Sequence, residues 1–206
     1  MAQRPVFMVK RAAPYFSTWS AEFKYNGGFA VSQKQKNITA VHSAFTTAHP
    51  DKKILEVSTK SLQELGVALS AFNLKKYVPS LGKSIPVENV FQGGKKFSGG
   101  GPFTDMYSAS PIQAKKDERL KSSGRLLAFC FEGKEYPLTL TPSFYDWIYI
   151  TALTENPALL EALLEYDAFT DIEFNPGRSL NCQAKACAIC VSLARMDKLD
   201  TINEWF

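Results

Sequence analysis

Glycine and proline divide this chain of 206 residues into short segments, and this division constrains the fold most strongly. Strand-like segments such as PVFMVK, STWSAEFKY, KILEVST and FTDIEF are interspersed with helical patterns. Because the two kinds do not alternate regularly as strand, helix and strand, the order predicts an α+β fold, rich in helix, with short strands and hairpins. We predict a single domain over residues 1–206, with residues 5–32 as an N-terminal strand extension packed on it.

Proline before a helical pattern and glycine after it mark the expected helix boundaries. A hairpin is expected to turn at Gly133-Lys134, residues 97–103 should form a loop, and FTDIEF should form a strand. Residues 26–28 are expected to form a turn in the N-terminal strand segment. Helices are expected at 38–48, from Ser61 to near Gly66, at 86–97, from Ser110 to Gly124, from Thr141-Pro142, from Asn156-Pro157, and from Cys182 onward.

Charge is distributed unevenly along the chain. The net charge is +5 over residues 1–74, +6 over 75–125 and −6 over 141–206. A basic half is typical of a protein with a polyanionic ligand, although a solvated lysine surface explains it equally well. The sequence contains no run of 18 apolar residues, so it predicts no membrane span. Basic residues interrupt the N-terminal segment, so we expect no secretory signal and a cytoplasmic location.

Several catalytic and metal-binding classes lack their motifs. The sequence has no G-x-S-x-G, H-E-x-x-H or G-x-G-x-x-G pattern in the required context, and it has two histidines. Cys182, Cys187 and Cys190 have the spacing of an iron–sulfur site, but the fourth cysteine is missing and the run ACAICVSLA also fits a buried helix. We predict no metal and no cofactor.

Three sets of residues suggest chemistry. Glu88, Gln92 and Lys95 have i, i+4, i+7 spacing, so a helix over 86–97 would carry them on one face, with a carboxylate, an amide and an amine together. An ordinary ion pair on the surface is the alternative. The glycines of residues 99–101 would allow a backbone to approach a phosphate, although a flexible turn is the commoner explanation.

The third set is polar and aromatic. It comprises LSAFN at 69–73, FYDW at 144–147, and the acids and asparagines of TDIEFNPGRSLN at 170–181. Acids within FTDIEF suggest a pocket wall, whereas an edge strand with solvated acids explains them equally well. Aromatic residues such as Tyr145 and Trp147 lie in the core more often than they form a base-stacking surface.

Long phrases of this sequence resemble the NADAR proteins, and most closely their DarT-associated antitoxins. The phrases are LSAFN, VENVFQGGKKF, SPIQAKKDERLKSSG, FYDWIYITAL and YDAFTDIEFNPGRSLNCQAKACA, and the resemblance extends from about Phe7 to about Leu199. It implies a NADAR-like domain that removes ADP-ribose from guanine bases in DNA by cleaving the N-glycosidic bond that a DarT-type toxin makes. YbiA-type relatives instead act on riboflavin precursors, and this chain lacks their D-x-x-W-G phrase.

The resemblance also implies the site residues. Glu88, Gln92 and Lys95 match the central helix of the family, Lys115 its A-K phrase, and Glu173 and Asn181 its late Glu and Asn. The other matching positions are Asn73, at the end of S-x-F-N, and the subgroup's Gly100, Gly101, Asp105, Asp117, Arg119, Tyr145, Asp146 and Trp147.

These matches suggest a mechanism. Glu88, with Glu173 as the second candidate, would assist cleavage of the glycosidic bond. Lys95 or Lys115 would attack C1 of the ring-opened ribose as a Schiff base. Glycines 100 and 101 would cradle the pyrophosphate, Arg119 would pair with phosphate, and Phe91 or Trp147 would stack on adenine or on a guanine splayed out of single-stranded DNA.

Two other functions remain open. One is a YbiA-like N-glycosidase for a small riboflavin-pathway intermediate. The other is a non-catalytic module that binds ADP-ribose or a DarT-type toxin. Charge alone does not separate these readings from the glycohydrolase, whose product would be free ADP-ribose.

Overall fold

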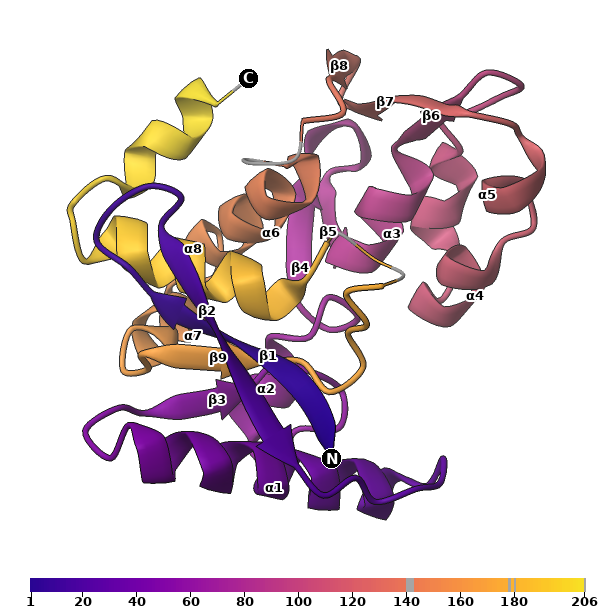
Figure 1. Ribbon diagram of the computed structural model, residues 1–206. Coiled ribbons are helices and arrows are strands. Elements are labelled where there is room, and N and C mark those ends of the chain that lie inside the picture. The colour runs from indigo at the N-terminus through magenta and orange to yellow at the C-terminus, as the bar shows by residue number, and fades with distance from the viewer. Residues whose placement is uncertain (140–142, 178, 180, 206) are drawn as a thin grey trace. The chain divides into compact units, whose positions relative to one another are not determined.

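The computed structural model describes residues 1–139, 143–177, 179 and 181–205 and shows an α+β protein (Figure 1). The chain forms two compact units. Unit 1 comprises residues 1–70 and 157–201, and unit 2 comprises 71–156 and 202–206. The prediction of one domain over residues 1–206 stays a prediction.

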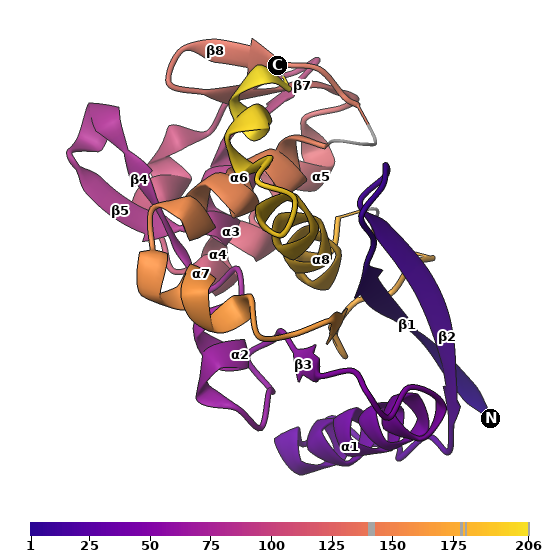
Figure 2. The same cartoon turned by 90° about the vertical axis from the view of Figure 1, so that its left-hand side faces the viewer.

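Unit 1 is built around a four-stranded sheet of order β2-β1-β9-β3. The strands β1 (Ala2–Val9) and β2 (Phe16–Phe23) form an antiparallel hairpin that runs obliquely in Figure 2, with its lower end beside α1 (Val31–Ala48). β9 (Ala168–Thr170) is antiparallel to β1 and parallel to β3 (Ile54–Glu56). The remaining helices are α2 (Glu64–Ala68), α7 (Pro157–Leu163) and α8 (Gln183–Ala194).

One face of the β1–β2 hairpin packs on α1. Val6 and Ala21 of the hairpin are fully buried against Val41 and Phe45 of the helix, with Ile54 and Ala168 from the neighbouring strands. Side chains alternate between the two faces of a strand, so this core leaves the opposite face of the hairpin to other contacts.

Unit 2 contains two small sheets and several short helices. β4 (Lys75–Val78) pairs with β5 (Lys83–Pro86), and β6 (Lys95–Phe97) pairs with β7 (Leu126–Phe131), which also pairs with β8 (Lys134–Tyr136). The helices are α3 (Val87–Gly93), α4 (Pro111–Lys116), α5 (Arg119–Ser122) and α6 (Phe144–Thr154), with 3₁₀ turns η1 (Pro79–Leu81) and η2 (Thr104–Ser108); a further turn, η3 (Leu199–Glu204), follows α8.

Several local predictions are confirmed. The hairpin expected around Gly133 forms as β7 and β8, although its turn is Glu132-Gly133, because Lys134 already pairs with Phe131; the helix expected after Asn156 begins at Pro157. Of the loop expected over residues 97–103, residues 98–103 contain neither helix nor strand, whereas Phe97 is the last residue of β6. The expected start of a helix at Thr141-Pro142 lies outside the described residues; α6 begins at Phe144, after a capping box in which Ser143 and Asp146 bond each other.

Other boundaries were wrong. Within residues 5–32, the strands end at Phe23, and Asn26-Gly27-Gly28 leads into α1 instead of joining two strands. Gly66 lies inside α2 because its missing side chain leaves space for Ser61 and the backbone of Glu56. The helix expected over 86–97 ends at Gly93, and the one expected up to Gly124 is divided into α4 and α5.

FTDIEF is also shorter as a strand than expected. β9 ends at Thr170, so Asp171 and Glu173 follow the strand and do not interrupt it. In the described part of the chain, no helix is long and apolar enough to cross a membrane.

Candidate functional site

The short helix α3 positions the carboxylate of Glu88 in unit 2. Pro86 precedes the helix with extended backbone, and every residue from Val87 to Gly93 is buried. The amides of Val87 and Glu88 donate to the carbonyl oxygens of Leu74 and Ala71, both at 2.9 Å. A buried helix that is anchored at its first turn holds its side chains in fixed directions, which a catalytic carboxylate needs.

Three side chains form a hydrogen-bonded row that begins at this carboxylate. Gln92 Nε2 donates to Glu88 Oε1 at 2.9 Å, and Lys95 Nζ donates to Gln92 Oε1 at 2.7 Å. An ionised carboxylate only accepts and an ammonium only donates, so the amide of Gln92 has one orientation that satisfies both neighbours. The predicted grouping of these three residues is therefore present, although the helix expected to produce it is not.

Lys95 reaches Gln92 from β6. Gly94 ends the helix, and Lys95 pairs with Phe129 of β7 in the adjoining sheet. Its amine lies 4.8 Å from the centroid of the Phe91 ring. The pKa of Lys95 is lowered to about 8, chiefly by burial; the charge of Glu88 opposes this shift, and the charge of Lys115 adds to it. About a tenth of this amine is neutral at pH 7, far more than for an ordinary lysine.

Lys115 approaches the same carboxylate from α4. Its Nζ lies 3.6 Å from Glu88 Oε1 and 5.2 Å from the centroid of the Phe72 ring. The capping box of Ser110 and Gln113 fixes the start of α4 and hence the position of Lys115 two residues later. The Lys115 side chain is 58% exposed, whereas that of Glu88 is 6% exposed, so the ion pair lies where the buried carboxylate meets solvent.

The glycine loop lies against the strand that carries Lys95. A side chain at Gly101 would collide with the carbonyl oxygen of Lys95, and Gly101 has a φ of 87°. Gly100 accepts a hydrogen bond at its carbonyl oxygen from the amide of Phe97, at 2.8 Å. Close packing on β6 thus explains Gly101 without a ligand, and the phosphate cradle stays a prediction.

Arg119 is held by two carboxylates. Its guanidinium donates to both oxygens of Asp105, at 3.2 and 2.6 Å, and to both oxygens of Asp117, at 3.0 and 2.8 Å. It also lies over the ring of Phe103, with Cζ 4.5 Å from the centroid. Arg119 lowers the pKa of both aspartates. A phosphate on Arg119 would have to displace one of these carboxylates.

The aromatic candidates belong to a packed wall. The Phe91 ring stacks on Phe129 and meets the edge of Tyr145, with centroids 5.2 and 5.0 Å away. Trp147 packs among Phe131, Tyr136 and Phe144. Asp146 is fully buried and accepts from the amide and hydroxyl of Ser143. These contacts agree with the core alternative for Tyr145 and Trp147 and place Phe91 beneath the Lys95 amine.

The remaining predicted residues are divided between the units. Asn73 lies in unit 2, exposed and next to Phe72. Glu173 and Asn181 lie in unit 1, where Glu173 is exposed and pairs with Lys34 at 3.3 Å. The proposed role of Glu173 as the second carboxylate therefore stays a prediction.

Sequence reasoning missed a buried polar network in unit 1. Glu56 accepts from the hydroxyls of Ser58 and Thr170, at 2.7 and 2.6 Å, and from the amide of Ile172 at 2.8 Å. His42 Nε2 lies 2.9 Å from the Thr170 hydroxyl. Burial raises the pKa of Glu56 and lowers that of His42 to about 4. A lone acid in the apolar run KILEV was the signal that could have revealed it.

The three clustered cysteines do not form a metal site in the described structure. Cys182, Cys187 and Cys190 are free and buried. Among the residues that the structure describes, no group of three His, Cys, Asp or Glu side chains could hold a metal ion.

The fold and the row Glu88–Gln92–Lys95 define an α+β protein with a buried carboxylate connected to a lysine of lowered pKa. Residues 2–205 match the family of DarT1-associated NADAR antitoxins, and the chain belongs to that family. A comparison with curated proteins gives no match.

Proposed function

We propose that this antitoxin is an ADP-ribosyl-guanine glycohydrolase, which removes ADP-ribose from guanine bases in single-stranded DNA after modification by a DarT-type toxin. Membership of the antitoxin family supports the biological role. The observation that carries the enzymatic role is the amine of Lys95, whose pKa is lowered to about 8 and which hydrogen-bonds through Gln92 toward Glu88.

The proposed reaction begins with the neutral amine of Lys95. The ring-opened ribose presents C1 as an imine of the guanine amino group, and the lysine nitrogen adds to that carbon. The C1–N bond to guanine then breaks, the guanine leaves with its amino group intact, and C1 becomes an imine of the lysine. Water adds to this imine and releases ADP-ribose as the aldehyde, which regenerates the amine.

Glu88 and Gln92 assist by proton transfer and orientation. The carboxylate of Glu88 is buried and lies two hydrogen bonds from Lys95 Nζ, so it can accept the proton that the amine loses and return it to the departing guanine nitrogen. Gln92 is a positioning residue, because its amide fixes the direction of both neighbours.

Lys115 is the rival nucleophile. Its Nζ lies 3.6 Å from Glu88 Oε1 and its side chain is mostly exposed, so its amine lacks the burial that lowers the pKa of Lys95. We therefore assign the covalent step to Lys95 and assign Lys115 the role of a cation beside Glu88, where it can attract the phosphates of the substrate.

Two alternatives make different predictions. A YbiA-like enzyme would act on a free riboflavin-pathway intermediate with little dependence on salt, whereas binding to DNA weakens as salt rises. A non-catalytic module would bind ADP-ribose or toxin and release no product. Cytoplasmic action and direct contact with the toxin stay predictions.

The test is a single-turnover incubation with an oligonucleotide that carries ADP-ribose on guanine, followed by mass spectrometry. Borohydride added during turnover would reduce a lysine imine and attach ADP-ribose to the protein permanently. We expect release of ADP-ribose and a trapped adduct at Lys95, with both lost in Lys95→Met and the adduct retained in Lys115→Met. Intact substrate after prolonged incubation with the wild type would refute the glycohydrolase.

A further inference from the structure

A buried asparagine of α3 lies outside the row Glu88–Gln92–Lys95. Asn89 directly follows Glu88 on the helix and is fully buried. Successive residues of a helix point about 100° apart, so the two side chains face different neighbours. Asn89 Nδ2 donates to the carbonyl oxygens of Met106 and Ala109, both at 2.8 Å. The asparagine therefore joins α3 to the end of η2, within unit 2.

The two carbonyl groups lie directly before α4. Ala109 is the residue after η2, and Ser110 is the N-cap of α4. The carbonyl oxygen of Met106 also accepts from the amide of Ala109 at 3.1 Å, which closes the last turn of η2. Figure 1 shows α3 and α4 next to each other, and the two helices are in contact. The bonds of Asn89 thus hold the point from which α4 begins.

A second contact holds the other end of η2. The amide of Phe103 donates to the carbonyl oxygen of Gly93 at 2.7 Å. A side chain at Gly93 would lie 2.7 Å from Cε1 of Tyr107, so helix and turn pack closely there. If the amide of Asn89 is removed, this contact still holds the start of η2. We therefore expect the end of η2 next to α4 to be released without loss of the whole turn.

The two N–H bonds of Asn89 explain why an asparagine occupies this position. Its Oδ1 is buried and has no hydrogen-bond partner within the described structure, which costs stability. Leucine has nearly the same shape and would avoid that cost, but it would leave both carbonyl groups without a donor. Serine has one donor and aspartate, when ionised, has none. Only the amide satisfies both carbonyl groups from this place on the helix.

The position of α4 determines how Lys115 meets Glu88. The Lys115 side chain is 58% exposed, and its amine lies 3.6 Å from Glu88 Oε1 and 5.2 Å from the centroid of the Phe72 ring. An exposed side chain with few contacts follows its backbone, whereas Glu88 and Asn89 share one buried helix. We propose that Asn89 is a positioning residue, whose amide holds the start of α4 against α3 and thereby sets the distance between the Lys115 amine and the Glu88 carboxylate.

This placement has a consequence for Lys95. The charge of Lys115 is one of the causes that lower the pKa of Lys95. Moving α4 away would weaken that effect and raise the pKa of Lys95. The pKa can be measured in the unliganded protein, so the structural part of the inference needs no substrate. Its effect on catalysis rests on the proposed function.

The experiment is a double-mutant cycle, with the pKa of Lys95 measured by NMR of ¹³C-labelled lysine. The proteins are the wild type, Asn89→Leu, Lys115→Met and the double variant. We expect Asn89→Leu to raise the pKa of Lys95 in the wild type and to have no further effect in Lys115→Met, because it acts through Lys115. An unchanged pKa in Asn89→Leu, or an equal rise in the Lys115→Met background, would overturn the proposal.

A second variant covers loss of folding. Asn89→Ser keeps one donor and should raise the pKa of Lys95 by less than Asn89→Leu does. If near-UV circular dichroism shows that Asn89→Leu is unfolded, Asn89→Ser takes its place in the cycle. An unchanged pKa of Lys95 in a folded Asn89→Ser would then overturn the proposal.

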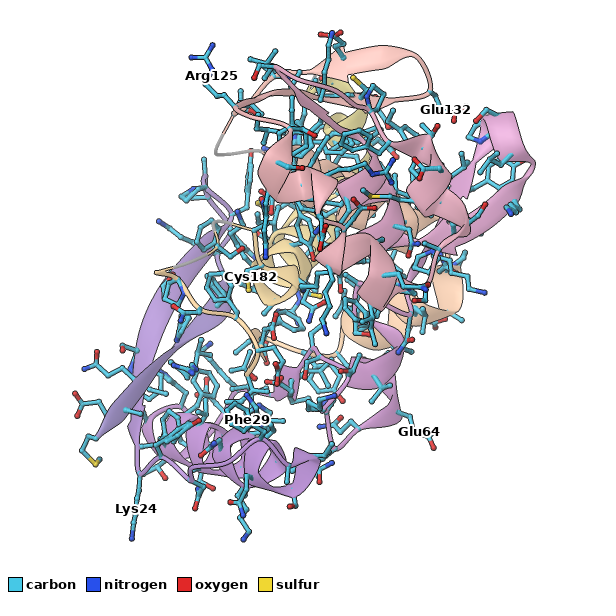
Figure 3. All side chains as sticks on the ribbon, turned by 90° about the vertical axis from the view of Figure 1, so that its right-hand side faces the viewer. Lys24, Phe29, Glu64, Arg125, Glu132 and Cys182 are labelled. Atoms are coloured by element: carbon cyan, nitrogen blue, oxygen red, sulfur yellow. The ribbon has the colours of Figure 1, made fainter. Side chains whose placement is uncertain are left out.

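Asn37 provides a matched control. It is also a buried asparagine of a helix, and its Nδ2 donates to the carbonyl oxygen of Asn26 at 3.0 Å. It lies on α1 in unit 1, which begins just after Phe29, labelled in Figure 3. Asn37→Leu should reduce stability but leave the pKa of Lys95 unchanged, because its bonds involve neither α3 nor α4. A rise equal to that in Asn89→Leu would show a general loss of stability and overturn the proposal.

Turnover of the modified oligonucleotide separates this inference from the proposed function. At pH 9, where most of the Lys95 amine is neutral, Asn89→Leu should raise KM about two- to fivefold, as Lys115→Met does, and retain most of kcat. A raised pKa of Lys95 in Asn89→Leu, with intact substrate in the wild type, would support the role of Asn89 and refute the glycohydrolase. Release of ADP-ribose by the wild type with an unchanged pKa in Asn89→Leu would do the reverse.

Discussion

The side-chain oxygen of Gln92 accepts a hydrogen bond from the Lys95 amine at 2.7 Å, while its nitrogen donates to Glu88 at 2.9 Å. The two contacts connect the end of a buried helix to the first residue of the next strand. Because an amide has one accepting and one donating end, a single Gln92 side chain holds a carboxylate and an amine in a fixed relation without letting them neutralise each other directly.

Replacing Gln92 should therefore change the reactivity of Lys95 more than the stability of the fold. In Gln92→Leu the Lys95 amine loses its partner, and we expect single-turnover release of ADP-ribose to fall about 10- to 100-fold. In Gln92→Glu a carboxylate replaces the amide, which should raise the pKa of Lys95 and move the pH–rate profile toward alkaline pH. A pH–rate profile that is the same in both variants and the wild type would contradict the role of Gln92 as a positioning residue.

The rate of release should rise with pH through about 8. Lys95 attacks as the neutral amine, and its pKa is lowered to about 8, so the reactive fraction increases as pH rises toward that value and levels off above it. NMR of ¹³C-labelled lysine measures the same pKa without catalysis. Glu88→Gln should lower the pKa further, because it removes the charge that favours the ammonium. A rate that falls between pH 6.5 and 8.5 would contradict the assignment.

Gly101→Ala should destabilise unit 2. The new methyl group would collide with the carbonyl oxygen of Lys95, and the φ of 87° disfavours any side chain. We expect a loss of about 1–3 kcal/mol in the free energy of unfolding, measured by urea titration. Gly27→Ala is the matched control, because no atom lies within 4 Å of a side chain there. Equal stability of the two variants would show that the loop adapts.

His42 should make unit 1 less stable in acid. Burial lowers its pKa to about 4 in the folded protein, whereas the unfolded chain binds the proton near pH 6.5. The contribution of His42 to stability is therefore complete above pH 6.5 and is lost as pH falls toward 4. Between pH 7 and 5 the loss should be about 2 kcal/mol.

The titration of Glu56 changes the stability in the opposite direction to that of His42. A variant is therefore needed to separate the two contributions. The raised pKa of Glu56 means that protonation in acid favours the folded state and offsets part of the loss. His42→Gln keeps a donor for Thr170 but does not titrate, so its stability should fall less than that of the wild type between pH 7 and 5. Urea titrations at the two pH values provide the comparison, and identical losses would exclude His42 as the cause.

Local features of the fold could be predicted from short stretches of sequence. Pro157 begins α7, and Gly133 belongs to the turn of the β7–β8 hairpin, because these residues restrict or free the backbone wherever they occur. The limits of the strands could not be predicted in this way. β9 ends at Thr170 because that residue is the last to pair with β3, and a pairing partner more than a hundred positions away leaves no local signal.

The sequence by itself determined that Glu88 and Gln92 share one face of α3, since they are four residues apart, and it suggested Lys95 as a third member through a helix that the structure does not continue that far. Only the tertiary structure decided how they meet. Pairing of Lys95 with β7 ends the helix at Gly93 and returns the lysine to Gln92 from a strand. The lowered pKa of Lys95 has the same origin, because burial depends on the Phe91 ring and the surrounding unit, not on the identity of adjacent residues.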